Sequence, residues 1–137
     1  APPPLEPSHP CWPGHDSKYA KLGVRLQEIP CTESLHDTLL RTMPCFHESI
    51  APALRAGNNV LVVTHGNVVR LLAKYIDELT DEQVEQLDIP QCTPLVYTLR
   101  RSDLRPVTKS RTYAPLSGYF LGNTDEVHRK MKSVRAE

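Results

Sequence analysis

Several features that would mark a protein for a particular partner are missing from this sequence. Its 137 residues contain 16 lysines and arginines against 16 aspartates and glutamates, so the formal net charge is zero. A balanced charge gives no support to a nucleic-acid or membrane-surface partner, because both attract an excess of positive charge. No apolar run reaches the roughly 20 residues that span a bilayer, and no signal peptide opens the chain. We therefore expect a cytoplasmic protein without a nucleic-acid or membrane partner.

The sequence also lacks a recognisable metal-binding pattern. Its four cysteines are scattered, and neither a Cys-x-x-Cys pair nor a matching pair of histidines accompanies them. Zinc sites depend on such spacings, so we expect no metal. Free thiols in a reducing compartment are the simpler interpretation, and the spacing leaves disulfides open. The cysteines are Cys11, Cys31, Cys45 and Cys92.

The amino-terminal half combines a proline-rich segment with a helical pattern. Residues 1–32 hold seven of the 13 prolines and show no sustained periodicity, which predicts an extended surface segment. From Thr32 onward, apolar residues recur at steps of three or four, which predicts a helix with one apolar face. Pro44 should kink or split this helix, and Gly57 should end it. The residues of the apolar stripe are Leu35, Leu39, Met43, Phe46, Ile50 and Leu54.

A strand followed by a helix is predicted in the middle of the chain. Residues 60–63 are a continuous aliphatic run, which is typical of a parallel strand buried on both faces. A helix follows whose shared face contains Val68, Leu72, Tyr75, Ile76 and Leu79. The later elements are a capped short helix from Thr80 to near Leu87, a strand over 94–99 with a hairpin-like continuation over 105–108, a loop over 109–118 and a polar helix over 124–134. Together they predict an α/β sandwich with a parallel centre.

The only polar break in this central stretch is Thr64-His65-Gly66-Asn67, between the predicted strand and the helix. In open α/β sheets, ligands bind beyond the carboxyl ends of the strands, and the N–H groups that begin a helix favour anions such as phosphate. Gly66 would let a ligand approach the backbone, and His65 could present a hydrogen bond or positive charge to an oxyanion. The residues thus predict a phosphate or carboxylate site. The alternative is that His65 satisfies only a strand-end carbonyl and Gly66 only makes a turn.

The remaining histidines and one acidic residue do not lie in such a context. The histidines fall in the proline-rich segment, off the apolar stripe, or in the terminal helix, so we expect no catalytic role for them. They are His9, His15, His36, His47 and His128. Glu33 is the one acid that could serve as a proton donor, but its place beside a helix start is explained equally well by the helix dipole.

Longer stretches of the sequence resemble one enzyme family. The segments THGNVVRLLAKYI, LTDEQVEQLDIPQCTPLVYTL and YFLGNTDEV resemble the cofactor-dependent phosphoglycerate mutases of the histidine phosphatase superfamily. Upstream, PPPLEPSHP, WPGHDSKYAKL and IPCTESLHDTLLRTMPCFHESIAPALRAG follow the same family in the same order. The resemblance covers nearly the whole chain and implies a three-layer α/β/α sandwich. Two extra residues over 23–26 and an insertion over 109–118 depart from the family pattern.

The resemblance also implies a reaction and roles for particular residues. His65 matches the family's second active-site histidine, which stabilises the transferring phosphoryl group, and Gly66 and Asn67 match the pair that contacts phosphoglycerate. The implied reaction is the interconversion of 3-phosphoglycerate and 2-phosphoglycerate in glycolysis and gluconeogenesis. It would proceed through a phosphohistidine primed by 2,3-bisphosphoglycerate, without a metal, in a homo-oligomeric isomerase. A bisphosphoglycerate synthase or phosphatase balance stays open. Val68 and Cys92 depart from the family's serine and glycine.

One motif of the family does not occur in the sequence. The phosphate-accepting histidine of these mutases lies in an Arg-His-Gly-Glu motif, and no Arg-His pair occurs in the 137 residues. The family's acidic proton donor and catalytic arginine would also lie upstream of Ala1. We therefore expect residues 1–137 to be the carboxyl-terminal portion of a single mutase-like domain that is inactive alone. The alternative is a non-catalytic module that binds anions or serves as an interaction surface.

Overall fold

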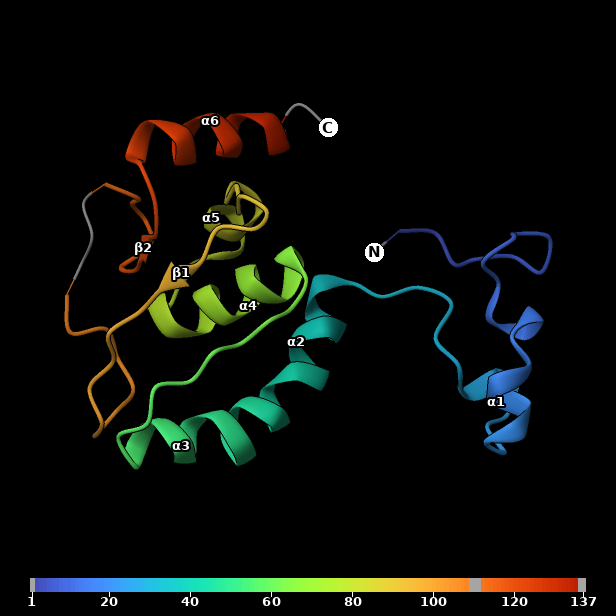
Figure 1. Ribbon diagram of the computed structural model, residues 1–137. Coiled ribbons are helices and arrows are strands. Elements are labelled where there is room, and N and C mark those ends of the chain that lie inside the picture. The colour runs from blue at the N-terminus through green and yellow to red at the C-terminus, as the bar shows by residue number, and fades with distance from the viewer. Residues whose placement is uncertain (1, 109–111, 136–137) are drawn as a thin grey trace. The chain divides into compact units, whose positions relative to one another are not determined.

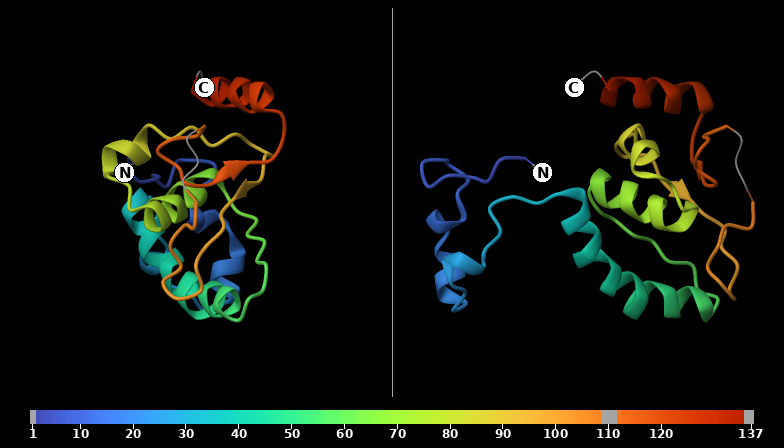
Figure 2. Two further views of the ribbon diagram at one scale, coloured as in Figure 1. Left: turned by 90° about the vertical axis from the view of Figure 1, so that its left-hand side faces the viewer. Right: turned by 180° about the vertical axis from the view of Figure 1, so that it is seen from behind.

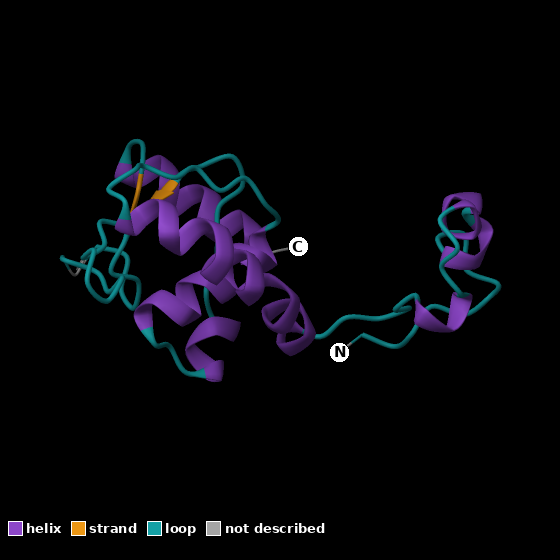
Figure 3. Ribbon diagram, turned by 90° about the horizontal axis from the view of Figure 1, so that it is seen from below, coloured by secondary structure: helices purple, strands orange, loops and turns teal. Residues whose placement is uncertain are grey.

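The structure is a computed structural model that describes residues 2–108 and 112–135. It contains helices and a small sheet, which is consistent with an α/β class (Figure 1; Figure 3). The chain divides into two compact units, Ala1–Thr38 and Leu39–Glu137. Among the described residues, the predicted three-layer arrangement is not seen, because the only named strands are two short ones.

The first unit contains short helical turns where the sequence predicts an extended segment. They are the 3-10 turn η1 (Pro13–His15), the helix α1 (Ser17–Lys21) and the 3-10 turn η2 (Leu26–Glu28). Asp16 caps α1, because its carboxylate accepts a hydrogen bond of 2.9 Å from the Lys18 N–H. Residues 2–32 contain no buried side chain, so local capping rather than a core holds these turns.

The predicted long helix forms as three consecutive segments, α2 (Leu35–Cys45), the π-helical η3 (Phe46–Ile50) and α3 (Ala51–Arg55). Pro44 lies inside α2 and Pro52 lies in the first turn of α3, and neither has an N–H for the usual helical bond. Between the two prolines the helix widens, and the Ala51 N–H donates to the Phe46 carbonyl five residues earlier. The helix therefore continues past Pro44, with its irregular turn directly after α2.

Gly57 ends this helix, as the sequence predicts. Its φ of 88° lies in the left-handed region that favours glycine. The N–H groups of Gly57 and Asn58 donate to the carbonyls of Leu54 and Ala53 at 2.9 and 3.1 Å. These two bonds form a Schellman motif, which satisfies carbonyls that the helix end would otherwise leave without a partner.

The aliphatic run at residues 60–63 is the main departure from the prediction. The structure assigns it no strand, and Figure 1 shows an extended trace between α3 and α4. Leu61 and Val63 are 84% and 87% exposed. The predicted buried central strand is therefore wrong for this structure. A parallel strand needs a neighbouring backbone, and among the described residues no strand pairs with this segment.

The remaining elements follow the predicted order, with much shorter strands. They are α4 (Gly66–Asp77), α5 (Asp81–Glu85), β1 (Leu95–Val96), β2 (Tyr119–Phe120) and α6 (Thr124–Arg135). The strands β1 and β2 pair antiparallel, so no parallel centre is present among the described residues. The predicted hairpin-like continuation is present as an isolated antiparallel bridge between Leu99 and Pro106.

Two apolar clusters include different residues of α4. One contains Phe46, Ala51 and Leu104, with Leu72 of α4 packed against it. The larger cluster includes Ala73 of α4 and residues of α5, β2, α6 and the loops that connect them. Its buried members are Ala73, Leu79, Val84, Leu87, Ile89, Tyr113, Leu116, Phe120 and Val127. Figure 1 and Figure 2 both show α4 between α3 and α6. Because α4 has residues in both clusters, the clusters hold in place the helix that carries the predicted site.

The predicted insertion loop contributes to this larger cluster. Residues 109–111 lie outside the described residues, but Tyr113 and Leu116 are buried, and Leu116 is only 1% exposed. The backbone N–H of Ser117 donates to the Asp77 carboxylate at 3.2 Å, and the Tyr97 hydroxyl donates to the same carboxylate at 2.7 Å. Burial and this bond raise the pKa of Tyr97. Asp77, the last residue of α4, is therefore held both by this segment and by Tyr97, which directly follows β1.

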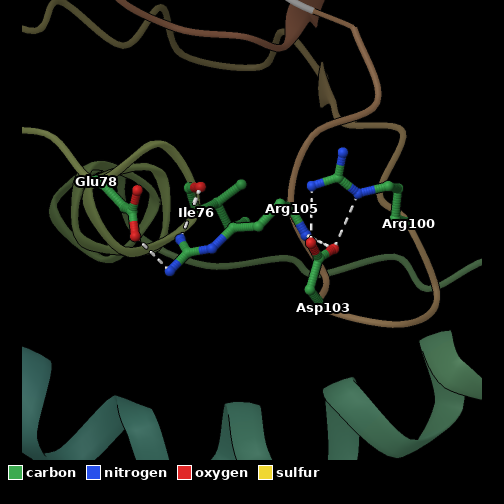
Figure 4. Close-up of polar contacts among 5 residues, drawn as sticks. All are labelled: Ile76, Glu78, Arg100, Asp103 and Arg105. Atoms are coloured by element: carbon green, nitrogen blue, oxygen red, sulfur yellow. Dashed lines mark hydrogen bonds and ion pairs between the residues drawn. The ribbon is translucent and has the colours of Figure 1, made fainter.

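Arg105 holds the same end of α4 from another direction (Figure 4). Its Nη1 donates to the carbonyls of Tyr75 and Ile76 at 2.9 and 3.2 Å, and its Nη2 lies 2.6 Å from Oε1 of Glu78. A cation near the last carbonyls of a helix complements the helix dipole. The turn that presents Arg105 is itself held by Asp103.

The Asp103 turn leads to a prediction about pH. Arg100 donates to both Asp103 oxygens, at 3.1 and 2.7 Å, and the Arg105 N–H donates at 3.0 Å. These bonds, that of Arg100 first, lower the pKa of Asp103 from 3.8 to about 2. Because the folded pKa is the lower one, the stabilisation is complete above pH ~4 and is lost as the pH falls through about 2.

Replacing Asp103 by asparagine should therefore lower the melting temperature at pH 7 by a small amount, since the site is exposed. The difference in melting temperature between the parent chain and the Asp103→Asn variant should shrink below pH ~4 and vanish only below the folded pKa of about 2. A difference that stays constant over this range would contradict the assignment.

Candidate anion-binding site

His65 is the N-cap of α4. Its backbone is extended, with φ −72° and ψ 149°, and its Nδ1 accepts a hydrogen bond of 3.2 Å from the Asn67 N–H. The His65 carbonyl accepts from the Val68 and Val69 N–H groups at 2.9 and 3.1 Å. The side chain thus satisfies one of the N–H groups that every helix start leaves without an internal partner.

This cap determines which nitrogen of His65 can meet a ligand. A neutral imidazole has one donor and one acceptor nitrogen. Because Nδ1 accepts from Asn67, the proton of the neutral ring lies on Nε2, and the side chain is exposed. Nε2 can therefore donate to an anion while the cap stays in place. An imidazolium could not accept from Asn67, so a cationic His65 would have to release the cap.

Gly66 is not required by the fold at its own position. A Cβ atom built on Gly66 would meet nothing within 4 Å, and its φ is not positive. Neither packing nor backbone strain therefore explains why a glycine stands at the first position of α4. The open space in front of its backbone is what a closely approaching ligand would need.

Arg70 is a further candidate for the site that the sequence reasoning missed. It lies three residues after Asn67 and hence on the same face of α4. Its Nη1 lies 3.4 Å from the Asn67 Oδ1, and its Nε is a buried atom with no hydrogen-bond partner in the structure. The three-residue spacing between Asn67 and Arg70 could have indicated it. When Arg70 donates to the Asn67 Oδ1, the amide nitrogen of Asn67 stays available to donate to a ligand.

The electrostatics of this helix end favour an anion. α4 has 12 residues and no acidic residue in its first turn. Its N–H groups therefore present the positive end of the helix dipole without a neighbouring carboxylate to offset it. The guanidinium of Arg70 adds a full positive charge one turn into the helix. The structure thus brings together the three residues predicted from the sequence, His65, Gly66 and Asn67, and adds Arg70.

The other histidines make local contacts instead. In the first unit, the His9 Nδ1 accepts from the Cys11 N–H at 3.1 Å, and the His15 Nε2 lies 3.1 Å from the Pro7 carbonyl. In the second, the ring of His47 packs edge-on against Tyr75. These contacts are local, and none of them involves the residues at the start of α4.

Within residues 2–108 and 112–135, no three His, Cys, Asp or Glu residues gather as a metal ion would require. No helix within the same ranges is long and apolar enough to cross a membrane. The first unit has a cavity of about 880 Å³ lined by residues that include Trp12, Lys18 and Tyr19, and none of the predicted site residues lines it.

Comparison with known protein families adds to this geometry. The family model described as "Histidine phosphatase superfamily (branch 1)" matches residues 11–110. The match covers more than half of the chain and includes all four residues at the start of α4 described above.

Proposed function

Because the chain belongs to the histidine phosphatase superfamily (branch 1), we propose that it takes part in phosphoryl transfer and that His65 stabilises the transferring group. Membership suggests chemistry of the phosphatase or mutase type. The observation that carries the proposal is the start of α4. An exposed histidine with Nε2 as its donor, a glycine whose Cβ position meets no protein atom and an asparagine occur together there. These groups suit a phosphate ester rather than an apolar ligand.

The proposed role of His65 is electrostatic. In phosphoryl transfer, charge spreads over the three equatorial oxygens while the attacking and leaving oxygens lie in line. A hydrogen bond from His65 Nε2 to one of these oxygens would become stronger as that charge develops. The Asn67 amide nitrogen would bind another oxygen or the ester group, with its orientation set by Arg70. Both side chains are placed before the ligand arrives, so the transition state needs little rearrangement.

At a finer level, we propose a cofactor-dependent phosphoglycerate mutase. The complete enzyme would interconvert 3-phosphoglycerate and 2-phosphoglycerate, with 2,3-bisphosphoglycerate as the phosphate primer. The order and length of the resembling segments support this choice, and His65, Gly66 and Asn67 match the family residue by residue. A nucleophilic histidine must carry the phosphate between the two half-reactions. His65 is occupied as a cap through Nδ1 and lacks a preceding arginine, so we assign the carrier role to a histidine outside residues 1–137.

The rival proposal is a non-catalytic module that binds an anion at the same helix end. The absence of any Arg-His pair from the 137 residues favours it. Both proposals use His65, Gly66 and Asn67 for binding, but only the first needs a partner histidine that becomes phosphorylated. A phosphorylation experiment therefore separates them.

We predict that the 137-residue chain alone acquires no acid-labile phosphate when incubated with radiolabelled 2,3-bisphosphoglycerate. Adding a polypeptide that carries the family's Arg-His-Gly-Glu half should restore labelling, on that polypeptide, if the two pieces associate. The same mixture, with His65→Asn in this chain, tests whether the histidine at the start of α4 contributes to the labelling. Stoichiometric phosphohistidine on the isolated chain would overturn the assignment of the carrier, and no labelling in the associated mixture would favour the non-catalytic module.

A second prediction concerns Gly66. Replacing Gly66 by alanine should leave the melting temperature unchanged or slightly higher, because the new Cβ meets no protein atom and alanine favours helices over glycine. The same Cβ would stand where a ligand must approach the backbone. Binding of 2,3-bisphosphoglycerate should weaken by about tenfold, a cost of ~1.4 kcal/mol. Titration of the chain with the ligand, followed by calorimetry, measures this, and unchanged binding would show that the ligand does not approach the Gly66 backbone.

A further inference from the structure

We propose that Arg70 is a positioning residue that makes the start of α4 selective for an anion, because it fixes which end of the Asn67 amide can meet a ligand. This inference rests on the proposed function, since it concerns the same site, and it assigns the selectivity to one contact. The contact joins Nη1 of Arg70 to Oδ1 of Asn67 at 3.4 Å. The two residues are three positions apart, which makes them neighbours on one face of the helix.

The side chain of Asn67 needs such a contact because its two ends have opposite character. The Oδ1 end accepts hydrogen bonds, the Nδ2 end donates them, and a rotation about the last side-chain bond exchanges the two. Asn67 is exposed, and its Nδ2 donates to no described residue. Without a neighbour that selects one orientation, the same side chain would offer an acceptor to a cation or a hydroxyl group as readily as a donor to a phosphate.

A guanidinium selects the orientation for a simple chemical reason. All of its N–H groups donate and none of its atoms accepts, so the end of the amide that faces Arg70 is Oδ1. Nδ2 is thereby left to donate to a ligand. The His65 cap has a similar effect on the backbone, because the Asn67 N–H is already bound to Nδ1 of His65 at 3.2 Å. The side chains of the two residues then have only donors left for a ligand, Nε2 of His65 and Nδ2 of Asn67.

The surroundings of Arg70 indicate that packing does not explain its guanidinium. Its Nε is a buried atom without a hydrogen-bond partner, which is unfavourable for a donor. Within residues 2–108 and 112–135 Arg70 forms no ion pair, whereas Arg100 and Arg105 each pair with a carboxylate. An unbranched apolar side chain would cover the same part of the helix without burying a polar atom. The guanidinium therefore serves the Asn67 contact rather than the stability of the fold.

The test is a double-mutant cycle in the 137-residue chain, with 2,3-bisphosphoglycerate as the probe and calorimetry to measure its binding. Arg70→Met keeps an unbranched stem and removes the donors, so it should weaken binding by about tenfold. Its melting temperature should be unchanged or higher, because the unpartnered Nε is gone. Asn67→Ala should weaken binding by a similar factor. In the Asn67→Ala chain, Arg70→Met should weaken binding by less than about twofold, because a residue that acts through another loses its effect when the other is absent.

Lys74→Met is the matched control for charge. It removes the same positive charge from the same helix, four residues further on, where Lys74 pairs with Asp81 and not with Asn67. Screening by salt should limit its effect on binding to less than about twofold.

A second measurement reports the contact without any ligand. The Cγ resonance of Asn67 moves downfield when Oδ1 accepts a hydrogen bond. In the chain without ligand, Arg70→Met should therefore move this resonance upfield, and Lys74→Met should leave it in place. A role of Arg70 in packing alone would not produce this difference between the two variants.

The outcomes separate this inference from the proposed function. If Arg70→Met weakens binding as much in the Asn67→Ala chain as in the parent chain, Arg70 acts on the ligand directly and the inference is overturned. A Cγ resonance that Arg70→Met does not move also overturns it, while binding by the parent chain would leave the proposed site in place. A parent chain that does not bind 2,3-bisphosphoglycerate would instead overturn the proposed site, and the inference with it.

Discussion

Replacing His65 by asparagine is expected to lower the turnover of phosphoryl transfer by about 100- to 1000-fold, as the loss of one preorganised electrostatic contact typically does. The measurement requires an enzyme that contains this chain together with the phosphate-accepting half of the family. Asparagine is among the best N-cap residues, so the variant can still accept from an N–H group at the start of α4. The cap is kept, and the Nε2 donor is removed. The loss should appear in kcat far more than in ground-state binding.

The capping role of His65 provides its own control. His65→Ala removes both the cap and the donor, so it should lower the stability of the chain by ~0.5–2 kcal/mol, whereas His65→Asn should not. His47→Asn, at an exposed histidine away from α4's start, should change neither turnover nor ligand binding. Near-normal turnover of His65→Asn would show that His65 is only a helix cap. Similar losses of stability in the asparagine and alanine variants would show that the loss of turnover comes from a lost cap and not from the lost Nε2 donor.

Replacing Leu116 by alanine is expected to lower the free energy of unfolding by ~2–5 kcal/mol, the usual cost of such a cavity. Leu116 is 1% exposed and belongs to the larger apolar cluster, together with Tyr113 and Phe120. The removed side chain would leave a void among residues from separate parts of the chain. Chemical denaturation followed by circular dichroism measures the loss.

Leu121 provides the matched comparison for Leu116. It lies close to Leu116 in the sequence but is 50% exposed, so Leu121→Ala should change stability by less than ~0.5 kcal/mol. If Leu116→Ala were as mild as Leu121→Ala, the segment over residues 112–118 would be a peripheral loop, as its composition suggests. Because these residues help to hold the carboxyl end of α4 through Asp77, a severe loss should also weaken ligand binding at the other end of that helix.

Local signals in the sequence predicted the helices from α2 onward well. The Thr80 and Gln83 pair predicts the capping box that starts α5, and both of its hydrogen bonds are present at 2.9 and 3.3 Å. Gly57 predicts the end of α3 for an equally local reason. Such features depend on residues three to five positions apart, so the sequence contains all the atoms that decide them.

The strands were predicted less well, because their partners lie far away in the sequence. Residues 94–99 read as one strand, yet only Leu95 and Val96 form β1, where Phe120 and Tyr119 provide a neighbour. The length of a strand depends on its partner as well as on its own side chains. For the same reason, the loop composition of residues 112–118 concealed the burial of Tyr113 and Leu116.

The sequence by itself determined that His65, Gly66 and Asn67 stand at the start of an amphipathic helix, because the spacing of α4 and the glycine turn are local. The sequence also contained the likeness to the family, whose model matches residues 11–110. Only the tertiary structure decided that His65 uses Nδ1 as a cap, that Arg70 contacts Asn67, and that Leu116 is buried while Leu61 and Val63 are exposed. The physical reason is that aliphatic residues indicate a need for burial, whereas the surface that meets this need is supplied by distant parts of a chain or by another molecule.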